Sequence, residues 1–213
     1  MDGWIDGDET LLEASRFTVV RRQQPLAGGA TRGREVVLHP GSVVIVSLLS
    51  ADRVCLIDVV RTAVGATLLE LPAGTLDREE SLADAARREL LEETGYRSGR
   101  IEHAGSFWMS PGILRERMHL FVASDLEAGS QALEPGEQIT TRVVPWNEAV
   151  EMCLDGRIED AKTVAGILLV DARRTLAPKS ASPLESGSPV TQPSPHPLAS
   201  ARGFLAESGD SER

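Results

Sequence analysis

The chain has 213 residues, enough for one domain with a substantial core and a tail. Its 32 Asp and Glu residues outnumber its 22 Lys and Arg residues, for a formal net charge of −10. This balance argues against a nucleic-acid partner or an anionic membrane, because both require a basic surface. The two cysteines, Cys55 and Cys153, suggest neither a disulfide framework nor a zinc cluster. No signal-peptide pattern or membrane-length apolar run is present, so we expect a cytoplasmic protein.

The first half of the chain predicts strands separated by turns. Residues 1–16 are acidic and are expected to be loosely ordered, and residues 23–34, rich in glycine, are expected to form a loop. The apolar run 43–49 is typical of a strand covered on both faces, and it forms a hairpin with the next strand. The strands predicted in this half are 17–22, 35–39, 43–49, 54–61 and 67–71.

A helix is predicted to follow Ser81, which is a suitable N-cap. Its apolar residues recur at three- and four-residue spacing, and Gly95 stands where a helix C-terminus favours a left-handed backbone. After this helix we expect strands at 101–109, 117–124 and 139–145, a helix at 146–154, and a last helix that Asp160 caps and that ends near residue 176. The order predicts an α+β fold in which helices sandwich a mixed β-sheet, with antiparallel strands at the N-terminus.

From residue 177 the composition changes. Six prolines and many serines, with few large apolar residues, cannot bury a core. We therefore predict one domain, 17–176, followed by a disordered tail, 177–213.

Three glutamates on the central helix, Glu89, Glu92 and Glu93, project from one side because they are spaced i, i+3 and i+4. Their charges repel one another, and Arg88 can pair with Glu92 one turn on without neutralising all three. A hard divalent cation such as Mg²⁺ could do so, since it takes oxygen ligands. Taken alone, however, the glutamates also fit a solvated helix face.

The surroundings of these glutamates favour the metal site. The specified residues of the segment have the spacing G-x5-E-x7-R-E-U-x-E-E-x-G-U, where U is a bulky apolar residue, and they are Gly74, Glu80, Arg88, Glu89, Leu90, Glu92, Glu93, Gly95 and Tyr96. This pattern resembles the signature sequence of the Nudix hydrolases. The resemblance implies the Nudix fold and hydrolysis of a nucleoside diphosphate linked to another group, with Mg²⁺ or Mn²⁺ as cofactor.

The resemblance also assigns roles to residues. It implies that Glu89, Glu92, Glu93 and the carbonyl of Ala73 bind the metal. Arg88 would orient the glutamates, with Glu80 as a supporting carboxylate.

Beyond this signature, residues 17–176 resemble the ADP-ribose pyrophosphatase branch of the family. The similar segments are 39–43, 61–65, 70–74, 110–116 and 160–163, and Pro111 stands fifteen residues past the signature, where the branch has a diagnostic proline. The resemblance implies a substrate-binding set of Arg61, Glu70, Pro111, Gly112 and Glu116. Without it, Arg61 would be interpreted as a surface charge at a hairpin end and Glu70 as a strand-edge carboxylate.

The expected reaction converts ADP-ribose to AMP and ribose 5-phosphate. A further carboxylate must orient or deprotonate the attacking water. The resemblance favours Glu137 for this role, with Glu134 as the alternative, and a solvated acidic loop would explain both. Three aromatic residues could stack on the substrate, although core or edge positions are commoner for such side chains: Trp4, Phe17 and Trp108.

Relatives in this branch are dimers that exchange N-terminal strands, which implies a homodimer in which residues 17–39 could be swapped. Two other functional hypotheses remain. One keeps the chemistry but changes the substrate to another nucleotide sugar such as GDP-mannose. The other is a non-catalytic domain that senses a nucleotide, which would be expected to have an incomplete glutamate set.

Overall fold

The computed structural model describes residues 7–176, the range of every structural statement below. Trp4 and the tail 177–213 lie outside the described residues, so the expected disorder of the tail stays a prediction. No helix in the described part is long and apolar enough to cross a membrane.

The described residues form one ten-stranded mixed sheet and three α-helices. The strands are β1 (Glu9–Glu13), β2 (Thr18–Pro25), β3 (Thr31–Leu38), β4 (Ser42–Ser50), β5 (Arg53–Arg61), β6 (Ala66–Glu70), β7 (Ala73–Thr75), β8 (Tyr96–Ser110), β9 (Leu114–Ala128) and β10 (Ile139–Pro145). The helices are α1 (Leu82–Thr94), α2 (Trp146–Asp155) and α3 (Ala161–Leu176), and a short 3₁₀ turn, η1, covers Ala27–Gly29.

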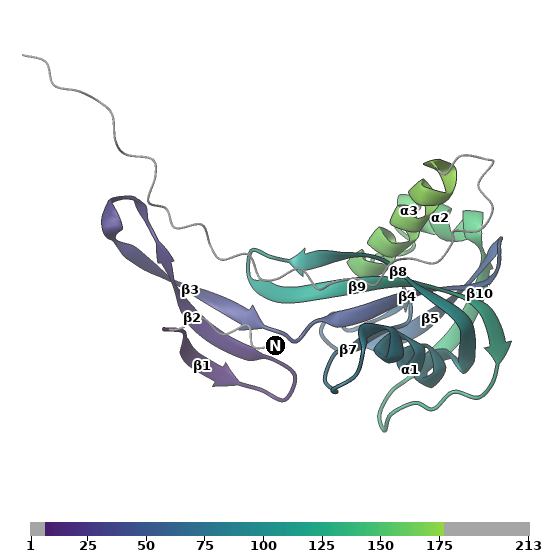
Figure 1. Cartoon of the computed structure of the whole chain (residues 1–213), viewed down its shortest axis with the longest axis horizontal. Helices are drawn as coiled ribbons and strands as arrows, with labels where there is room; N and C mark the ends of the chain where they lie inside the picture. The colour runs from purple at the N-terminus through teal and green to yellow at the C-terminus, as the bar shows by residue number, and fades with distance from the viewer. Residues whose placement is uncertain (1–6, 177–213) are drawn as a thin grey trace, which may run out of the picture. The chain divides into compact units, whose positions relative to one another are not determined.

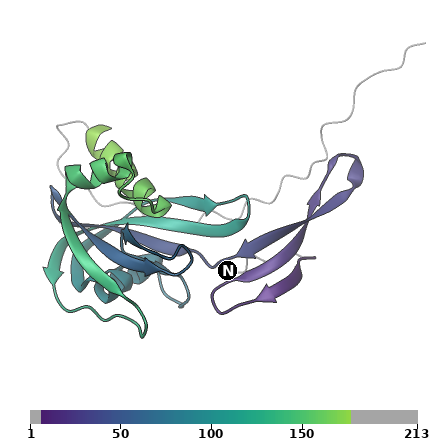
Figure 2. The same cartoon turned by 180° about the vertical axis from the view of Figure 1, so that it is seen from behind.

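The strand order is β1-β2-β3-β9-β4-β5-β10, with β6 beside β5, β7 beside β4 and β8 beside β9. Strand β9 runs parallel to β3 and β4, and the other pairs are antiparallel. Helix α1 covers one face of the central strands, and α2 and α3 cover the other (Figures 1 and 2). The predicted α+β architecture, with helices on both faces of a mixed sheet, is confirmed.

Strand β4 is the centre of both cores. Because successive side chains of a strand point to opposite faces, Val44 and Val46 face α2 and α3, whereas Val43 and Ile45 face α1. All four side chains are fully buried, which agrees with the prediction of a strand covered on both faces.

The ends of α1 follow the sequence prediction. The Ser81 side chain accepts a hydrogen bond from the Asp84 backbone N–H, and Gly95 has a left-handed backbone with φ 77°. Ala85, Ala86 and Leu90 form the buried side of the helix. Glu93 is buried beside them, so the glutamates lie along the edge of the packed side rather than opposite it.

The N-terminal region is more ordered than the sequence predicts. Residues 9–13 form β1 and pair with β2, so the expected loose order does not hold there. Arg21, on β2, forms ion pairs with Glu9 on β1 and Glu35 on β3. Likewise β2 and β3 extend into the predicted loop 23–34 and leave only a short connection. Side chains on this part of the sheet are mostly exposed on both faces, so the alternation that reveals a strand is absent.

Two other strands are also longer than expected. Strands β8 and β9 pair over most of 96–128 and are joined by a tight turn, so the predicted loop 125–138 begins later. The prediction missed their ends because glycine and charged residues interrupt the pattern.

Candidate active site

The glutamate side of α1 surrounds Arg88, and Arg78 lies 3.7 Å from Glu92 at its edge. Arg88 donates from Nη1 to Glu89 Oε1 at 2.6 Å and to Glu92 Oε2 at 2.9 Å. Its Nε and Nη2 both donate to Glu80 Oε1, at 2.9 and 2.7 Å. Burial opposes the charge of Arg88, but these carboxylates outweigh it and raise its pKa. The expected Arg88–Glu92 pair is thus present, and Glu80, two residues before the start of α1, joins the same cluster.

Strand β7 lies directly against this cluster. The Ala73 backbone N–H donates to Glu93 Oε2 at 2.8 Å. At Gly74 a Cβ atom would fall 1.8 Å from Glu89 Cδ, so a larger residue could enter only if Glu89 moved. The sequence therefore needs glycine at position 74 because the Glu89 carboxylate occupies the space beside it.

Two carboxylates on this side of α1, Glu89 and Glu93, are poorly stabilised as anions. Burial raises the pKa of Glu93 to about 8, and the charges of Glu89 and Glu137 act in the same direction, against the Ala73 N–H. Burial likewise raises the pKa of Glu89, although Arg88 opposes the shift. A bound cation would relieve both burial and repulsion.

The donor chemistry fits a hard divalent cation, since carboxylate and carbonyl oxygens are the ligands that Mg²⁺ and Mn²⁺ accept. Within residues 7–176, no group of three or more His, Cys, Asp or Glu residues already stands at metal-binding geometry. The reason is visible in the contacts: Arg88 attracts Glu89 and Glu92, while Ala73 N–H holds Glu93. These side chains would have to turn from those partners to hold a metal.

The two candidate bases lie in the exposed loop before β10. Glu137 Oε2 accepts a hydrogen bond from the Glu134 N–H at 2.8 Å, and its charge raises the pKa of Glu93. Glu134 instead pairs with Arg78 at 3.3 Å. The electrostatic coupling to Glu93 favours Glu137 over Glu134.

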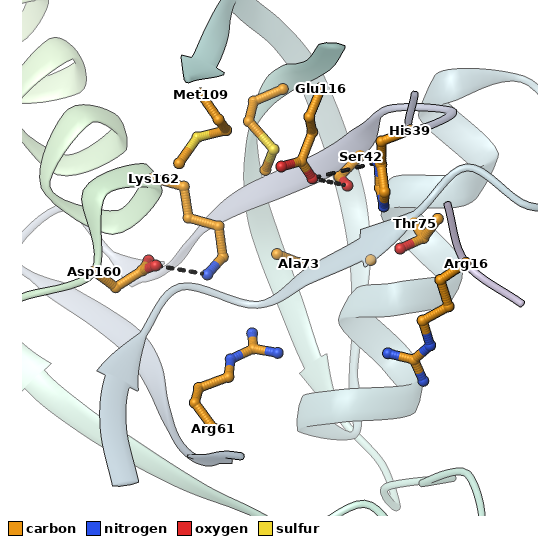
Figure 3. A pocket seen from close by; sticks show the side chains of 12 residues that line it. Arg16, His39, Ser42, Arg61, Ala73, Thr75, Met109, Glu116, Asp160 and Lys162 are labelled. Atoms are coloured by element: carbon orange, nitrogen blue, oxygen red, sulfur yellow. Dashed lines mark hydrogen bonds and ion pairs between the residues drawn. The ribbon is translucent and has the colours of Figure 1, made fainter. Parts of the chain in front are cut away.

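Beside β7 opens a pocket of about 330 Å³. Figure 3 shows Arg61, Asp160 and Lys162 along one side and His39, Ser42 and Glu116 on another. Its lining residues are Arg16, His39, Ser42, Arg61, Ala73, Gly74, Thr75, Met109, Glu116, Met118, Asp160 and Lys162. Arg61, Ala73 and Glu116, all expected at the site, thus meet in one pocket.

Glu116 is fixed by the chain segment that precedes and begins β4. Ser42 Oγ donates to Glu116 Oε1 at 2.8 Å, and His39 Nδ1 lies 3.5 Å from the same oxygen. The resemblance pointed to the segment 39–43 but assigned no role to either residue. What the linear sequence could not show is that β4 and β9 pair in parallel and bring position 42 beside this part of β9.

Glu70 differs from the expectation that it faces the substrate. It is fully buried and is not among the residues that line the pocket. Its oxygens accept from Arg61 Nε at 2.7 Å and Nη2 at 2.6 Å, and Oε2 also pairs with Lys162 Nζ. Burial alone would raise the pKa of Glu70, but these two cations outweigh it and lower that pKa. Glu70 therefore holds pocket residues from behind.

Other expected contacts are also absent from the lining of this pocket. Pro111 and Gly112 are exposed in the β8–β9 turn. Trp108 packs against the Arg117 guanidinium, 5.4 Å from the ring centroid, and Phe17 is 40% exposed. Neither aromatic lines the pocket. One pocket residue was not selected from the sequence. Arg16, which precedes β2, lines the pocket, and no sequence pattern pointed to it.

Comparison with known proteins identifies the family. Residues 38–167 match the NUDIX domain family. The chain is 33% identical to the methanol dehydrogenase activator of Bacillus methanolicus over 72% of this chain and 84% of the relative. It is 29% identical to the ADP-ribose pyrophosphatase of Bacillus subtilis (strain 168), over 71% of this chain and 83% of that protein.

Two further comparisons bear on the fold and the substrate. A crystal structure described as an ADP compounds hydrolase superposes with a TM-score of 0.71 at 25% identity, covering 82% of this chain and 95% of the other. The GDP-mannose pyrophosphatase of Pectobacterium atrosepticum is 41% identical, but over 46% of this chain and 51% of the relative. The chain belongs to the Nudix family, as the spacing of its glutamates predicts.

Proposed function

We propose that this protein hydrolyses the pyrophosphate bond of ADP-ribose, using Mg²⁺ or Mn²⁺, to yield AMP and ribose 5-phosphate. The observation that carries the proposal is that the carboxylate cluster on α1 lies beside the pocket. Ala73 belongs to both, because its N–H donates to Glu93 and the residue lines the pocket. Relatives named as ADP-ribose pyrophosphatase and a structural neighbour named as an ADP compounds hydrolase support this substrate class.

Each part of the site would have a distinct task. Bound at Glu89, Glu92, Glu93 and the Ala73 carbonyl, the metal would neutralise charge on the diphosphate and lower the pKa of a bound water. Arg88 would orient Glu89 and Glu92, whose carboxylates it contacts. Glu137 would accept the proton of the attacking water.

The pocket would orient the rest of the substrate. Glu70 holds Arg61 by accepting from its Nε and Nη2, and the N–H groups that remain on Nη1 and Nη2 would donate to phosphate oxygens. Glu116 lines the pocket, and Ser42 donates to its Oε1. Its Oε2 would therefore accept a hydrogen bond from a sugar hydroxyl.

The direct test incubates the protein with ADP-ribose and Mg²⁺ and follows AMP release by chromatography. Glu93→Gln should lose activity by orders of magnitude, whereas Glu151→Gln, the same change on the exposed side of α2, should not. A folded wild type that releases no AMP would contradict the proposal. So would full activity in Glu93→Gln.

GDP-mannose is the second candidate substrate, favoured by the local similarity to a GDP-mannose pyrophosphatase. Turnover of ADP-ribose and GDP-mannose at equal concentrations separates the two. A higher kcat/KM for GDP-mannose would replace the first assignment with the second.

We further propose a homodimer formed through the N-terminal strands. Exposed apolar side chains gather there: Leu11 is 40% exposed, Leu12 53% and Phe17 40%. Light scattering should give twice the chain mass, and replacing Leu12 with Glu should lower it. A monomeric wild type would contradict this.

A further inference from the structure

Lysine is rare in this chain. Of its 22 basic residues, two are lysines, Lys162 and Lys179, and the rest are arginines. Lys162 is therefore the one lysine in the part of the chain that the structure describes, and it lies in the pocket. A sequence that uses arginine at nearly every other basic position has lysine at this one.

The position of Lys162 is fixed by the start of α3. Asp160 Oδ2 accepts from the Thr163 backbone N–H at 3.0 Å and from Thr163 Oγ1 at 2.6 Å. Thr163 Oγ1 in turn accepts from the Leu71 N–H at 2.8 Å. This chain of hydrogen bonds ties the first turn of α3 to the end of β6, so that Lys162 cannot shift relative to Glu70 without breaking it.

The ammonium group has two carboxylate partners. Nζ pairs with Glu70 Oε2 and lies 3.0 Å from Asp160 Oδ1. Its side chain is 11% exposed, and the pocket borders it (Figure 3). An ammonium group has three N–H donors. Two are directed to Glu70 and Asp160, which leaves the third for a ligand in the pocket.

The chemistry of lysine suits this role. Its charge is compact and its donors can turn, whereas an arginine fork is wide and planar. Between Glu70, Asp160 and the pocket, a compact cation can satisfy three acceptors in three directions. Arg61, whose Nε and Nη2 donate to the same Glu70, lies on the same side of the pocket and has the N–H groups of Nη1 and the second N–H of Nη2 left for a ligand.

We propose that Lys162 binds a phosphate oxygen of the substrate, together with Arg61, while Glu70 and Asp160 act as positioning residues for that ammonium group. The proposal rests on the proposed function only in requiring that the pocket take a diphosphate. It does not depend on which nucleoside or sugar is attached. The competing explanation is that Lys162 only neutralises two carboxylates and touches no ligand.

Binding can be measured without turnover. The probe is methylenediphosphonate, a non-hydrolysable pyrophosphate analogue, titrated in buffer with EDTA so that protein side chains supply the positive charge. Lys162→Met should weaken binding about tenfold or more, the loss expected for one charged hydrogen bond. Arg157→Met, which removes an exposed cation paired with Asp155, should leave the affinity unchanged.

A second readout uses the wild type and so avoids any folding defect in the variant. With two lysines in the chain, protein labelled with ¹³C-lysine gives two sets of side-chain NMR signals, which Lys179→Met assigns while leaving Lys162 in place. The Lys162 Cε signal should shift in a saturable way as methylenediphosphonate is added, with the Lys179 signal as the internal reference.

The outcomes separate the two claims. An unmoved Lys162 signal, an unchanged affinity in folded Lys162→Met, or a wild type that does not bind the probe would each overturn the role of Lys162. Failure to hydrolyse ADP-ribose, with a normal Lys162 response to the probe, would overturn only the proposed function.

Discussion

The two charged regions of the site both combine buried carboxylates with cationic side chains, but carboxylates outnumber cations in one region, whereas the buried carboxylate has two cationic partners in the other. On α1, one arginine contacts Glu80, Glu89 and Glu92, and the neighbouring Glu93 has a pKa raised to about 8 by burial and by other carboxylates. At the end of β6, Glu70 is buried even more completely, yet Arg61 and Lys162 lower its pKa.

The difference shows what each region needs. The α1 cluster is short of positive charge, so it is suited to receiving a cation. The network around Glu70 already contains its cations, so it is suited to presenting them to an anion. The first region would gain its balancing charge from a bound cation, whereas the second already holds cations of its own.

Glu93→Gln should give the largest loss of activity and should distinguish the two regions most clearly. We expect kcat for ADP-ribose to fall about a hundredfold or more, since a group that holds charge at the reacting centre is lost. Stability in EDTA should be retained, because Gln still accepts from Ala73 N–H and removes an unfavourable buried charge. The activity assay measures kcat, and urea unfolding in EDTA measures stability. A large loss of stability in EDTA would contradict the inference that the α1 cluster is short of positive charge.

Glu70→Ala should give the largest loss of stability. Removing the carboxylate leaves Arg61 and Lys162 without their shared partner, and breaking a buried ion pair in this way costs about 3 kcal/mol or more. Urea unfolding measures it. Asp155→Ala is the matched control, because it removes an exposed carboxylate paired with Arg157 and should change unfolding little. Equal effects of the two substitutions would show that the network around Glu70 is not a stabilising unit.

The pH dependence of stability should reflect Glu70. Its pKa is lower in the folded chain than in the unfolded one, so its contribution is fully present above the unfolded pKa and is lost as pH falls through the folded pKa. The wild type should therefore lose stability below about pH 4.5 more steeply than Glu70→Gln. Urea midpoints between pH 3 and pH 6 test this, and parallel curves would contradict it.

Ser81→Ala should have the smallest effect. It removes the cap that accepts from the Asp84 N–H, which costs about 1 kcal/mol. Because Ala85, Ala86 and Leu90 still anchor α1, activity should fall far less than in Glu93→Gln. Thermal unfolding and AMP release measure the two quantities. A loss of activity as great as that of Glu93→Gln would mean that the glutamate cluster depends on the first turn of the helix.

The sequence alone determined the parts of this protein that depend on local spacing. The limits of α1, the shared side of its glutamates and the Arg88–Glu92 pair all follow from helical geometry over less than four turns. The family follows from the same segment. The burial of β4 on both faces was also predictable, because its apolar residues form a continuous run.

Only the tertiary structure decided how distant segments meet. It turned Glu70 from the expected substrate contact into a buried anchor, brought Lys162 to it from 92 positions further along the chain, and joined Ser42 to Glu116. It also extended β2 and β3 through residues whose pattern predicts a loop. For Glu70 and Glu116 the partner is supplied by a strand or helix far away in the sequence, and no local periodicity records which charge will be opposite a given carboxylate.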